Sequence, residues 1–231
     1  MRADLARVHS SFIIAKRRLF ISPANPIAGT AIAAPLWECS LLVLLAYLLG
    51  SMASAILVAR ALKLPDPRQH GSRNPGATNI LRLGGKKAAA LTLLGDLLKG
   101  LLPVLLARAL GLGGWPLALV ALAAFLGHLF PIYFGFRGGK GVATALGILL
   151  AYLPLLGLSV LLLWIAIFAW RRVSSLAALV ATLAAAPLAW AMALPTPAKS
   201  LVLTLAILIL WRHRSNLTRL LRGEESGFHP S

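Results

Sequence analysis

Cysteine and acidic residues are scarce in this sequence. Its single cysteine, Cys39, excludes an intramolecular disulfide and any metal cluster built on cysteine thiolates. Only 6 of the 231 residues are aspartate or glutamate, against 23 lysines and arginines. Charged residues make up 13% of the chain, whereas soluble globular domains contain about 25%. This composition excludes an ordinary soluble globular protein.

Apolar residues dominate what remains. They make up 59% of the chain and give it a mean hydropathy of +0.83, which indicates an integral membrane protein. The formal net charge of +17 would suit a nucleic-acid partner. The cations, however, lie between apolar segments, as the positive-inside rule predicts. We therefore expect the lipid bilayer as a partner and no nucleic acid.

Residues 1–35 differ in character from the rest of the chain. They carry five cations, and Pro23, Pro26 and Pro35 interrupt any long helix. A cleaved secretory signal is the less favoured interpretation, because its apolar core should follow the charges directly. We expect a basic, poorly ordered extension over residues 1–35 and one transmembrane domain over residues 36–231.

Seven apolar runs follow the extension. A helix needs about 20 residues to cross a hydrocarbon core of about 30 Å. The long run 142–170 is divided at Leu153-Pro154, because a residue before proline disfavours the helical conformation. The sequence therefore predicts an all-α, polytopic membrane protein with seven transmembrane helices. The predicted spans are residues 36–61, 88–110, 115–134, 142–153, 155–170, 176–194 and 198–211.

The distribution of charge predicts the orientation. With seven spans, fifteen cations lie on one side, in the connecting segments, at the ends of the spans or after the last span, and only Arg108 and Lys199 lie on the other. The positive-inside rule then places the carboxyl terminus in the cytoplasm. The five cations of the extension oppose this orientation, since they would lie outside.

Two features inside the spans predict packing. Ala46, Gly50 and Ser54 recur every four residues and form a small-residue face that admits a neighbouring helix. Asp96 and Lys99 lie three residues apart near the middle of the second span. Because isolated charges are costly in a membrane, we expect these two side chains to form an internal ion pair.

The first of three polar clusters covers residues 71–82. It contains three glycine or proline breakers and many hydrogen-bond donors, and it ends at Arg82. Asn and Ser favour turns for local reasons, which is one interpretation. The density of donors beside an arginine also suits an anionic ligand.

The second cluster, residues 135–144, places four glycines and two cations between strongly apolar runs. A helix that begins at Val142 would direct its free N–H groups and its dipole toward an anion near Lys140. The usual nucleotide-binding loop is excluded, because Lys140 is followed by Gly141 and not by Ser or Thr. The alternative interpretation is a flexible turn with positive-inside charges.

The third cluster, residues 212–219, follows the last span directly. In a helix, Arg212, Asn216 and Arg219 would share one face. The alternative is a juxtamembrane cluster that binds anionic lipid headgroups. The predicted orientation brings all three clusters to one membrane face, where they would form a cationic, glycine-lined site.

These clusters resemble, in order, the three signature motifs of the bacterial membrane-embedded acyl-phosphate:glycerol-3-phosphate acyltransferases. The matching segments are residues 71–82, 138–144 and 212–225, and the resemblance extends over about residues 36–225. It implies seven transmembrane helices in the bacterial inner membrane, with the active site at the cytoplasmic face. The implied helix number agrees with the number of apolar runs.

The resemblance also implies a reaction. A fatty acyl group moves from acyl phosphate to the 1-hydroxyl of glycerol 3-phosphate, giving lysophosphatidic acid and phosphate, as the first step of bacterial phospholipid synthesis. The resemblance implies no cofactor or metal. It does imply a functional link to the enzyme that makes acyl phosphate. The implied catalytic residues are Ser72, Arg82, Lys140, His213 and Asn216. The implied substrate-binding residues are Gly71, Asn74, Gly76, Thr78, Asn79, Gly138, Gly139, Gly141, Thr144, Arg212 and Arg219.

Two further positions complete the comparison of motifs. Glu225 matches a glutamate with a structural role, and Arg73 stands where the family more often has glycine. The base that accepts the hydroxyl proton is either His213 or the acyl phosphate itself. A covalent acyl intermediate on Ser72 is less favoured, because an activated donor does not require one.

Other functional classes fit less well. A membrane transporter of phosphorylated metabolites is the main alternative, since it would also combine several spans with a cationic site and intramembrane charges. Transporters usually place their sites at the midplane between repeats, and we find no internal repeat. Acyltransferases with an aspartate four residues after a histidine are excluded, because no histidine here has that neighbour.

Overall fold

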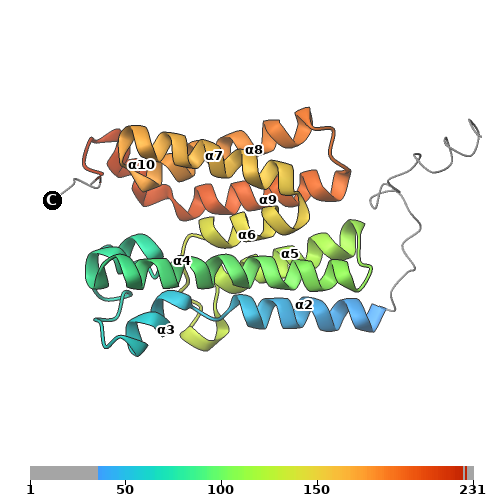
Figure 1. Cartoon of the computed structure of the whole chain (residues 1–231), viewed down its shortest axis with the longest axis horizontal. Helices are drawn as coiled ribbons and strands as arrows, with labels where there is room; N and C mark the ends of the chain where they lie inside the picture. The colour runs from blue at the N-terminus through green and yellow to red at the C-terminus, as the bar shows by residue number, and fades with distance from the viewer. Residues whose placement is uncertain (1–35, 226, 228–231) are drawn as a thin grey trace, which may run out of the picture. The chain divides into compact units, whose positions relative to one another are not determined.

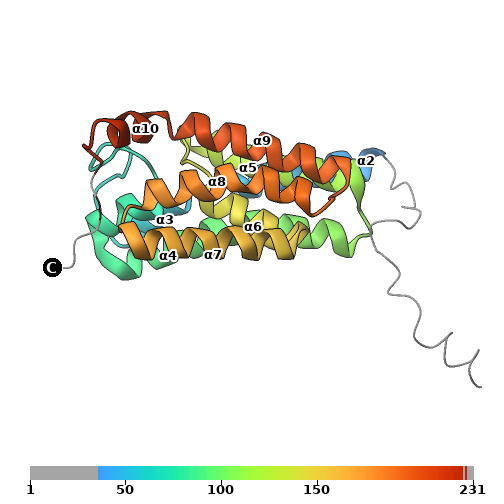
Figure 2. The same ribbon diagram turned by 90° about the horizontal axis from the view of Figure 1, so that it is seen from above.

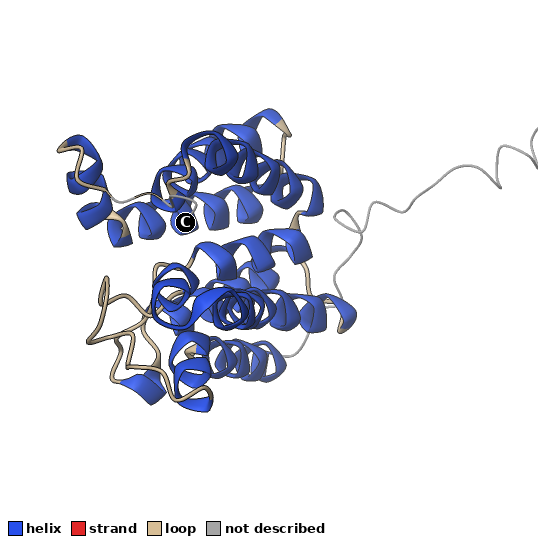
Figure 3. Ribbon diagram, turned by 60° about the vertical axis from the view of Figure 1, so that its left-hand side comes forward, coloured by secondary structure: helices blue, strands red, loops and turns tan. Residues whose placement is uncertain are grey.

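The computed structural model describes residues 36–225 and residue 227. All regular structure in this part of the chain is helical, as Figure 3 shows. The predicted basic extension, residues 1–35, lies outside the described residues. The elements are α2 (Leu36–Gly50), α3 (Ser54–Ala61), α4 (Ala77–Ala109), α5 (Gly114–Leu129), η1 (Ile132–Phe134), α6 (Val142–Tyr152), α7 (Pro154–Arg171), α8 (Ser174–Ala191), α9 (Thr196–Arg212) and α10 (Arg214–Leu221).

Four or five spans meet the length and hydropathy expected of a membrane crossing within the described residues. The four are 77–109, 114–134, 154–171 and 174–191, and the bent pair α2–α3 makes a fifth. Helix α6 has 11 residues and is shorter than a full crossing requires, whereas α9 has 17 and lies at the short end of the usual range. The described part of the chain is therefore all-helical and has several candidate membrane spans. This result does not establish the seven transmembrane helices that the sequence predicts.

The first predicted span is broken and not continuous. Helices α2 and α3 meet at an angle of 44° around residues 51–53. The Ser51 hydroxyl donates to the Tyr47 carbonyl at 2.8 Å, and the Lys99 ammonium donates to the Met52 carbonyl at 2.9 Å. The Tyr47 carbonyl also accepts from the Ser51 backbone N–H at 2.9 Å, whereas the Lys99 ammonium satisfies a carbonyl at the break that a continuous helix would pair internally.

The break also divides the predicted small-residue face. Gly50 packs on α5, where an added Cβ would lie 2.1 Å from the Ala124 carbonyl oxygen. Ser54 instead faces α4, where its hydroxyl would lie 2.7 Å from a Cβ on Gly95. The small residues allow close approach as predicted, but they do so against two different helices.

Helix α6 lies between two groups of helices, α2, α4 and α5 on one side and α7, α8 and α9 on the other (Figure 1). It packs very closely on α4, because a Cβ on Gly147 would lie 2.1 Å from the Leu97 carbonyl oxygen. The predicted break after α6 is confirmed at Leu153, and α7 starts at Pro154. The short helix therefore fills the centre of the bundle.

Within the described residues, the apolar interior has two separate parts. The main core joins α2 and α4–α9 and includes Phe125, Leu129 and Ile148. A smaller core, which we call the satellite core, joins α3 to the beginning of α4 and consists of Ala55, Ala59, Ile80 and Ala88 with Val58 and Leu64. Figures 1 and 2 show α3, α10 and the beginning of α4 at the same end of the bundle.

The predicted ion pair inside α4 is confirmed. The Lys99 ammonium lies 2.9 Å from a carboxylate oxygen of Asp96, and both side chains are 5% exposed. His128 of α5 adds a third group, with its Nδ1 3.5 Å from the same oxygen. The membrane-embedded charges therefore neutralise each other.

Candidate active site

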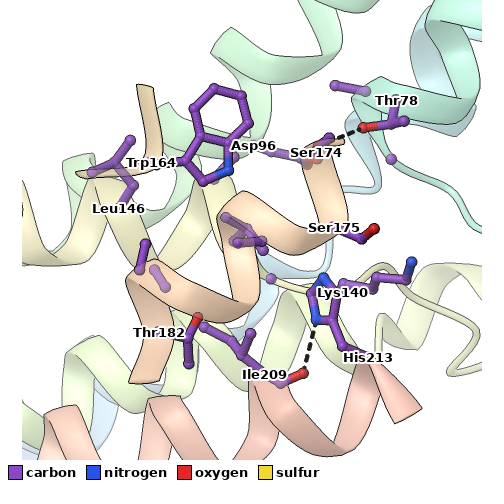
Figure 4. A pocket seen from close by; sticks show the side chains of 18 of the residues that line it. Thr78, Asp96, Lys140, Leu146, Trp164, Ser174, Ser175, Thr182, Ile209 and His213 are labelled. Atoms are coloured by element: carbon purple, nitrogen blue, oxygen red, sulfur yellow. Dashed lines mark hydrogen bonds between the residues drawn. The ribbon is translucent and has the colours of Figure 1, made fainter. Parts of the chain in front are cut away.

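One cavity of about 680 Å³ collects most of the predicted site residues (Figure 4). Twelve of them line it, from all three clusters: Gly71, Ser72, Asn74, Gly76, Thr78, Asn79, Arg82, Lys140, Gly141, His213, Asn216 and Arg219. Segments more than 130 residues apart in the sequence thus meet around a single space. This convergence is the geometric result that the three clusters predicted.

The first wall of the cavity consists of residues 71–82, and Asn79 organises it. The buried Asn79 amide donates to the carbonyls of Pro67 and His70, both at 3.0 Å, and its Oδ1 accepts from the Ser72 backbone N–H at 3.0 Å. Gly71 has φ +62°, and a Cβ there would lie 2.2 Å from Asn79 Oδ1. Asn79 therefore sets the shape of the loop that presents Ser72.

The second wall consists of residues 138–141 and 212–225. Its glycine segment bends sharply before α6, with Gly141 at φ +86° and its Cα facing the Phe125 ring. Helix α6 begins at Val142, as predicted. The Arg212 guanidinium donates to the carbonyls of Gly139 and Gly138 at 3.0 and 2.5 Å. Arg212 therefore holds this segment in place from α9.

Four predicted substrate-binding residues do not line the cavity: Gly138, Gly139, Thr144 and Arg212. Gly138 and Gly139 pack on the end of α5, where added Cβ atoms would lie 2.0 Å from the His128 carbonyl oxygen and 2.5 Å from His128 Nε2. Thr144 is buried and donates to the Asp96 carbonyl at 2.9 Å. Each of these contacts positions backbone near the cavity.

Glu225 is the centre of the second wall. Its Oε1 accepts from the Ser175 hydroxyl at 2.7 Å and from the Asn216 amide at 2.6 Å. Its Oε2 accepts from Arg219 Nε at 2.6 Å. Asn216 Oδ1 in turn accepts a hydrogen bond from the Lys140 ammonium. A chain of polar contacts thus links the second and third sequence clusters.

The third cluster is not one continuous helix. Helix α9 ends at Arg212, and α10 starts at Arg214 after the non-helical His213. The predicted face shared by Arg212, Asn216 and Arg219 is therefore wrong for Arg212, which turns to the glycine carbonyls. The break directs Asn216 and Arg219 toward Glu225.

The environment of the cavity shifts the pKa values of its ionisable groups. Burial lowers the pKa of Lys140 to about 8; the Glu225 carboxylate opposes this shift, and Arg219, Arg212 and Arg82 add to it. Burial would raise the pKa of Glu225, but hydrogen bonds from Ser175, Asn216 and Arg219 outweigh it and lower the pKa. Lys140 is therefore a cation that loses its proton only slightly above neutral pH.

His213 lies beyond the end of α9 and is 2% exposed. Burial lowers its pKa to about 4, with the hydrogen bond to Ile209 opposing the shift and the Lys140 charge adding to it. Nδ1 lies 2.9 Å from the Ile209 carbonyl oxygen, which can only accept (Figure 4). Nδ1 therefore carries the proton of the neutral ring, and Nε2 is a hydrogen-bond acceptor.

Away from its polar end the cavity is apolar. Helices α6, α7, α8 and α9 line it there with Leu146, Leu149, Val160, Trp164, Ala185 and Val202, among others. Along α8 the lining runs from Ser174 to Ala185, a rise of about 16 Å at 1.5 Å per residue. The cavity thus combines a cationic end with a long apolar compartment.

Some residues that line the cavity were not predicted as site residues from the sequence. Ser174 and Ser175 begin α8, and the Ser174 hydroxyl lies 3.4 Å from that of Thr78. Asp96 and His128 also line the cavity, although the prediction assigned Asp96 only to an internal ion pair. A single polar residue beside an apolar run does not indicate a binding site in the sequence. Only the fold brings such residues to the cavity.

The comparisons with known proteins agree on one family. The glycerol-3-phosphate acyltransferase family matches residues 40–223 of this chain. This chain belongs to that family. A glycerol-3-phosphate acyltransferase of Thioalkalivibrio sulfidiphilus is 58% identical over 197 residues, covering 80% of this chain and 92% of the relative. One of Methylococcus capsulatus is 52% identical over 186 residues, covering 80% and 94%.

A solved family structure also shares the fold. The crystal structure of PlsY (YgiH), an integral membrane glycerol 3-phosphate acyltransferase, in its glycerol 3-phosphate form has a TM-score of 0.80 and 42% identity. The similarity covers 83% of this chain and 96% of the PlsY chain. The lysophosphatidic acid form of PlsY has a TM-score of 0.77 and 41% identity. The family resemblance and the all-helical membrane fold are therefore confirmed.

Proposed function

We propose that this protein transfers a fatty acyl group from acyl phosphate to the 1-hydroxyl of glycerol 3-phosphate, forming lysophosphatidic acid and phosphate. The observation that carries the proposal is the two-part cavity, with the three polar clusters at one end and an apolar compartment between α6 and α9 at the other. Such a space fits a phosphorylated head and a fatty acyl tail together. The names of the family and of its PlsY structures support the same acceptor and product.

The polar end supplies the charge that two phosphorylated substrates need. Arg82, Lys140 and Arg219 line the cavity and lie on both walls. Two phosphates held side by side repel each other, and cations on both walls offset this repulsion. Arg212 acts indirectly, because it donates hydrogen bonds to the glycine segment that precedes Lys140 and holds it in place.

The remaining predicted catalytic residues position the reacting groups. In the transfer step, the acceptor hydroxyl oxygen bonds to the acyl carbonyl carbon, the bond from that carbon to the phosphate oxygen breaks, and phosphate leaves. Acyl phosphate is already activated, so catalysis consists mainly of positioning. Ser72 and Asn216 offer hydrogen bonds to the polar groups of the substrates, and His213 Nε2 accepts one from the attacking hydroxyl.

The proton of that hydroxyl passes to the departing phosphate. A base with a pKa of about 4, as His213 has, is weak at neutral pH, whereas a phosphate titrates near pH 6. His213 would then orient the hydroxyl without removing its proton. A His213→Gln variant that keeps near-normal kcat supports this assignment, and a loss of kcat that recovers at higher pH contradicts it.

The predicted topology is part of the proposal. Seven crossings follow if the bent α2–α3 pair, α4, α5, α6, α7, α8 and α9 each count as one, and the carboxyl terminus then lies in the cytoplasm. The gathering of α3, α10 and the start of α4 at one end supports a single cytoplasmic face of a bacterial inner membrane. Acyl phosphate would reach this face from the enzyme that makes it, and no cofactor or metal takes part.

The donor is tested directly with purified protein. We would supply glycerol 3-phosphate with acyl phosphate, acyl-CoA or acyl carrier protein in detergent and measure lysophosphatidate. We expect product with acyl phosphate alone, loss of product in Lys140→Ala, and retention in Lys199→Ala, a cation on α9 far from the site. Turnover with acyl-CoA alone contradicts the donor. Uptake of phosphate esters into vesicles without any product would favour the transporter.

A further inference from the structure

Helix α4 contains one residue whose backbone is not helical. Gly85 has φ +77° and ψ −173° and forms a kink between two helical segments of α4, nearer to Ala77 than to Ala109. This combination belongs to a region that is essentially restricted to glycine, and strained positions of this kind cluster at functional sites. A Cβ on Gly85 would meet nothing within 4 Å, so the need for glycine there comes from the backbone and not from crowding.

The part of α4 before Gly85 belongs to the first wall. Thr78, Asn79 and Arg82 all line the cavity from this segment, residues 77–84. Asn79 ties the segment to the preceding loop through the carbonyls of Pro67 and His70. Ile80, fully buried, anchors it in the satellite core with α3. The segment and its loop therefore form one unit.

The part of α4 after Gly85 continues into the membrane bundle. Its first turn still packs in the satellite core through Ala88, and Ala89, Ala90, Leu93 and Asp96 also line the cavity. This part of α4 carries the Asp96–Lys99 ion pair and packs against α6, where a Cβ on Gly100 would lie 2.2 Å from the Thr144 carbonyl oxygen. Thr144 is two residues into the helix that Lys140 and Gly141 precede. The angle between the two parts of α4 therefore determines how far Arg82 lies from the second wall.

We propose that Gly85 is a positioning residue for the acyl transfer: its glycine-only backbone conformation turns residues 77–84 so that Thr78 and Arg82 face Lys140 across the cavity. The inference rests on the proposed function. Gly85 acts through these side chains and not by contact with substrate. A residue with a Cβ strongly prefers helical dihedrals at this position, so it would straighten α4 and carry the whole unit away from the second wall.

Gly85→Ala tests the inference, and Gly111→Ala is its matched control. Gly111 also has positive φ, +83°, also meets nothing within 4 Å, and follows α4 at its other end. Both substitutions impose a backbone penalty in open space, but only the first would displace the site. We expect kcat/KM to fall about tenfold or more in Gly85→Ala, mainly through KM for glycerol 3-phosphate, and less than twofold in Gly111→Ala.

Coupling to Arg82 separates positioning from a general loss of stability. If Gly85 acts by placing Arg82, the substitution adds little further loss when Arg82→Ala is already present, since residues that act through one another are not additive. Full additivity of the two losses would overturn the inference. So would equal effects of Gly85→Ala and Gly111→Ala on kcat/KM.

A distance measurement gives a readout that does not depend on turnover. Spin labels on Gln69→Cys and Leu183→Cys, both exposed, in a Cys39→Ser background would report the separation of the first-wall loop from α8. We expect Gly85→Ala to shift this distance by several ångströms and Gly111→Ala to leave it unchanged. An unchanged distance in Gly85→Ala overturns the inference. Absence of lysophosphatidate from the unmodified enzyme would instead refute the proposed function.

Discussion

The two walls of the cavity are built in different ways. The contacts that shape the first wall, residues 71–82, are mainly uncharged: the Asn79 amide, the satellite core and the turned backbone at Gly85, with the Asp66–Arg68 ion pair on either side of the Pro67 carbonyl that Asn79 binds. The second wall, residues 138–141 and 212–225, is held by charge: Glu225 joins Arg219 and Asn216, and Arg212 holds the glycine carbonyls. One wall depends on conformation and the other on electrostatics.

This difference predicts that the walls fail under different conditions. Uncharged contacts respond little to pH and salt, whereas a network of ionised groups responds to both. Perturbation of the first wall should therefore change substrate binding in a similar way at every pH. Perturbation of the second wall should change the pH profile itself.

We expect the largest effect from removal of the charge at the centre of the second wall. In Glu225→Gln, the carboxylate that accepts from Ser175, Asn216 and Arg219 becomes an amide with only one acceptor oxygen. Hydrogen bonds to charged groups contribute about 1.5–3 kcal/mol each, so kcat/KM should fall about 100-fold. The measurement is lysophosphatidate formation together with thermal stability in detergent.

Glu224→Gln is the control for this variant. Glu224 is the exposed neighbour of Glu225, and we expect its substitution to leave activity within twofold. Equal losses in the two variants would show that net charge at the carboxyl end matters, and not the Glu225 network.

The first wall is tested at Asn79. Asn79→Ala leaves the Ser72 N–H and the carbonyls of Pro67 and His70 without their amide partner. Loss of partners for buried polar groups costs about 1–3 kcal/mol, and we expect kcat/KM to fall about tenfold, equally at pH 6.5 and pH 8.5. Gln69→Ala, in the same loop but exposed, should have no effect. A pH-dependent loss in Asn79→Ala would contradict the division between the walls.

The pH profile of the second wall is tested at Lys140. The ammonium is present below its pKa of about 8 and is lost as pH rises through that value, so kcat/KM of the free enzyme should fall about tenfold per pH unit above it. Arginine stays protonated throughout this range. Lys140→Arg should therefore lack this basic limb, whatever its activity at neutral pH. Persistence of the limb in Lys140→Arg would assign it to another group.

Much of this architecture could be predicted from the sequence because its signals are local. Apolar runs, the Leu153-Pro154 break and the helix start at Val142 depend on neighbouring residues, and the structure confirms the latter two. The Asp96–Lys99 pair followed from the cost of an isolated charge in a membrane. The convergence of the three clusters needed only a common membrane face.

The features that could not be predicted depend on contacts between distant segments. Arg212 was expected to face a ligand, but it is the last residue of α9 and donates to the glycine carbonyls. The break of the first span depends partly on Lys99, 47 residues away from Met52. The turn at Gly85 lies between the first cluster and the predicted second span. A single glycine there does not show whether the backbone continues as a helix or turns.

The smallest expected effect concerns the only direct hydrogen bond between the first wall and α8 among the described contacts, the one between the Thr78 and Ser174 hydroxyls at 3.4 Å. This distance is long for two hydroxyls, so the bond is weak. If Thr78 acts only through this bond to α8, Thr78→Val should lower kcat/KM less than threefold, and Thr78→Val with Ser174→Ala should lower it no further. If Thr78 also binds substrate, as the family motif implies, the loss exceeds tenfold and Ser174→Ala does not reproduce it.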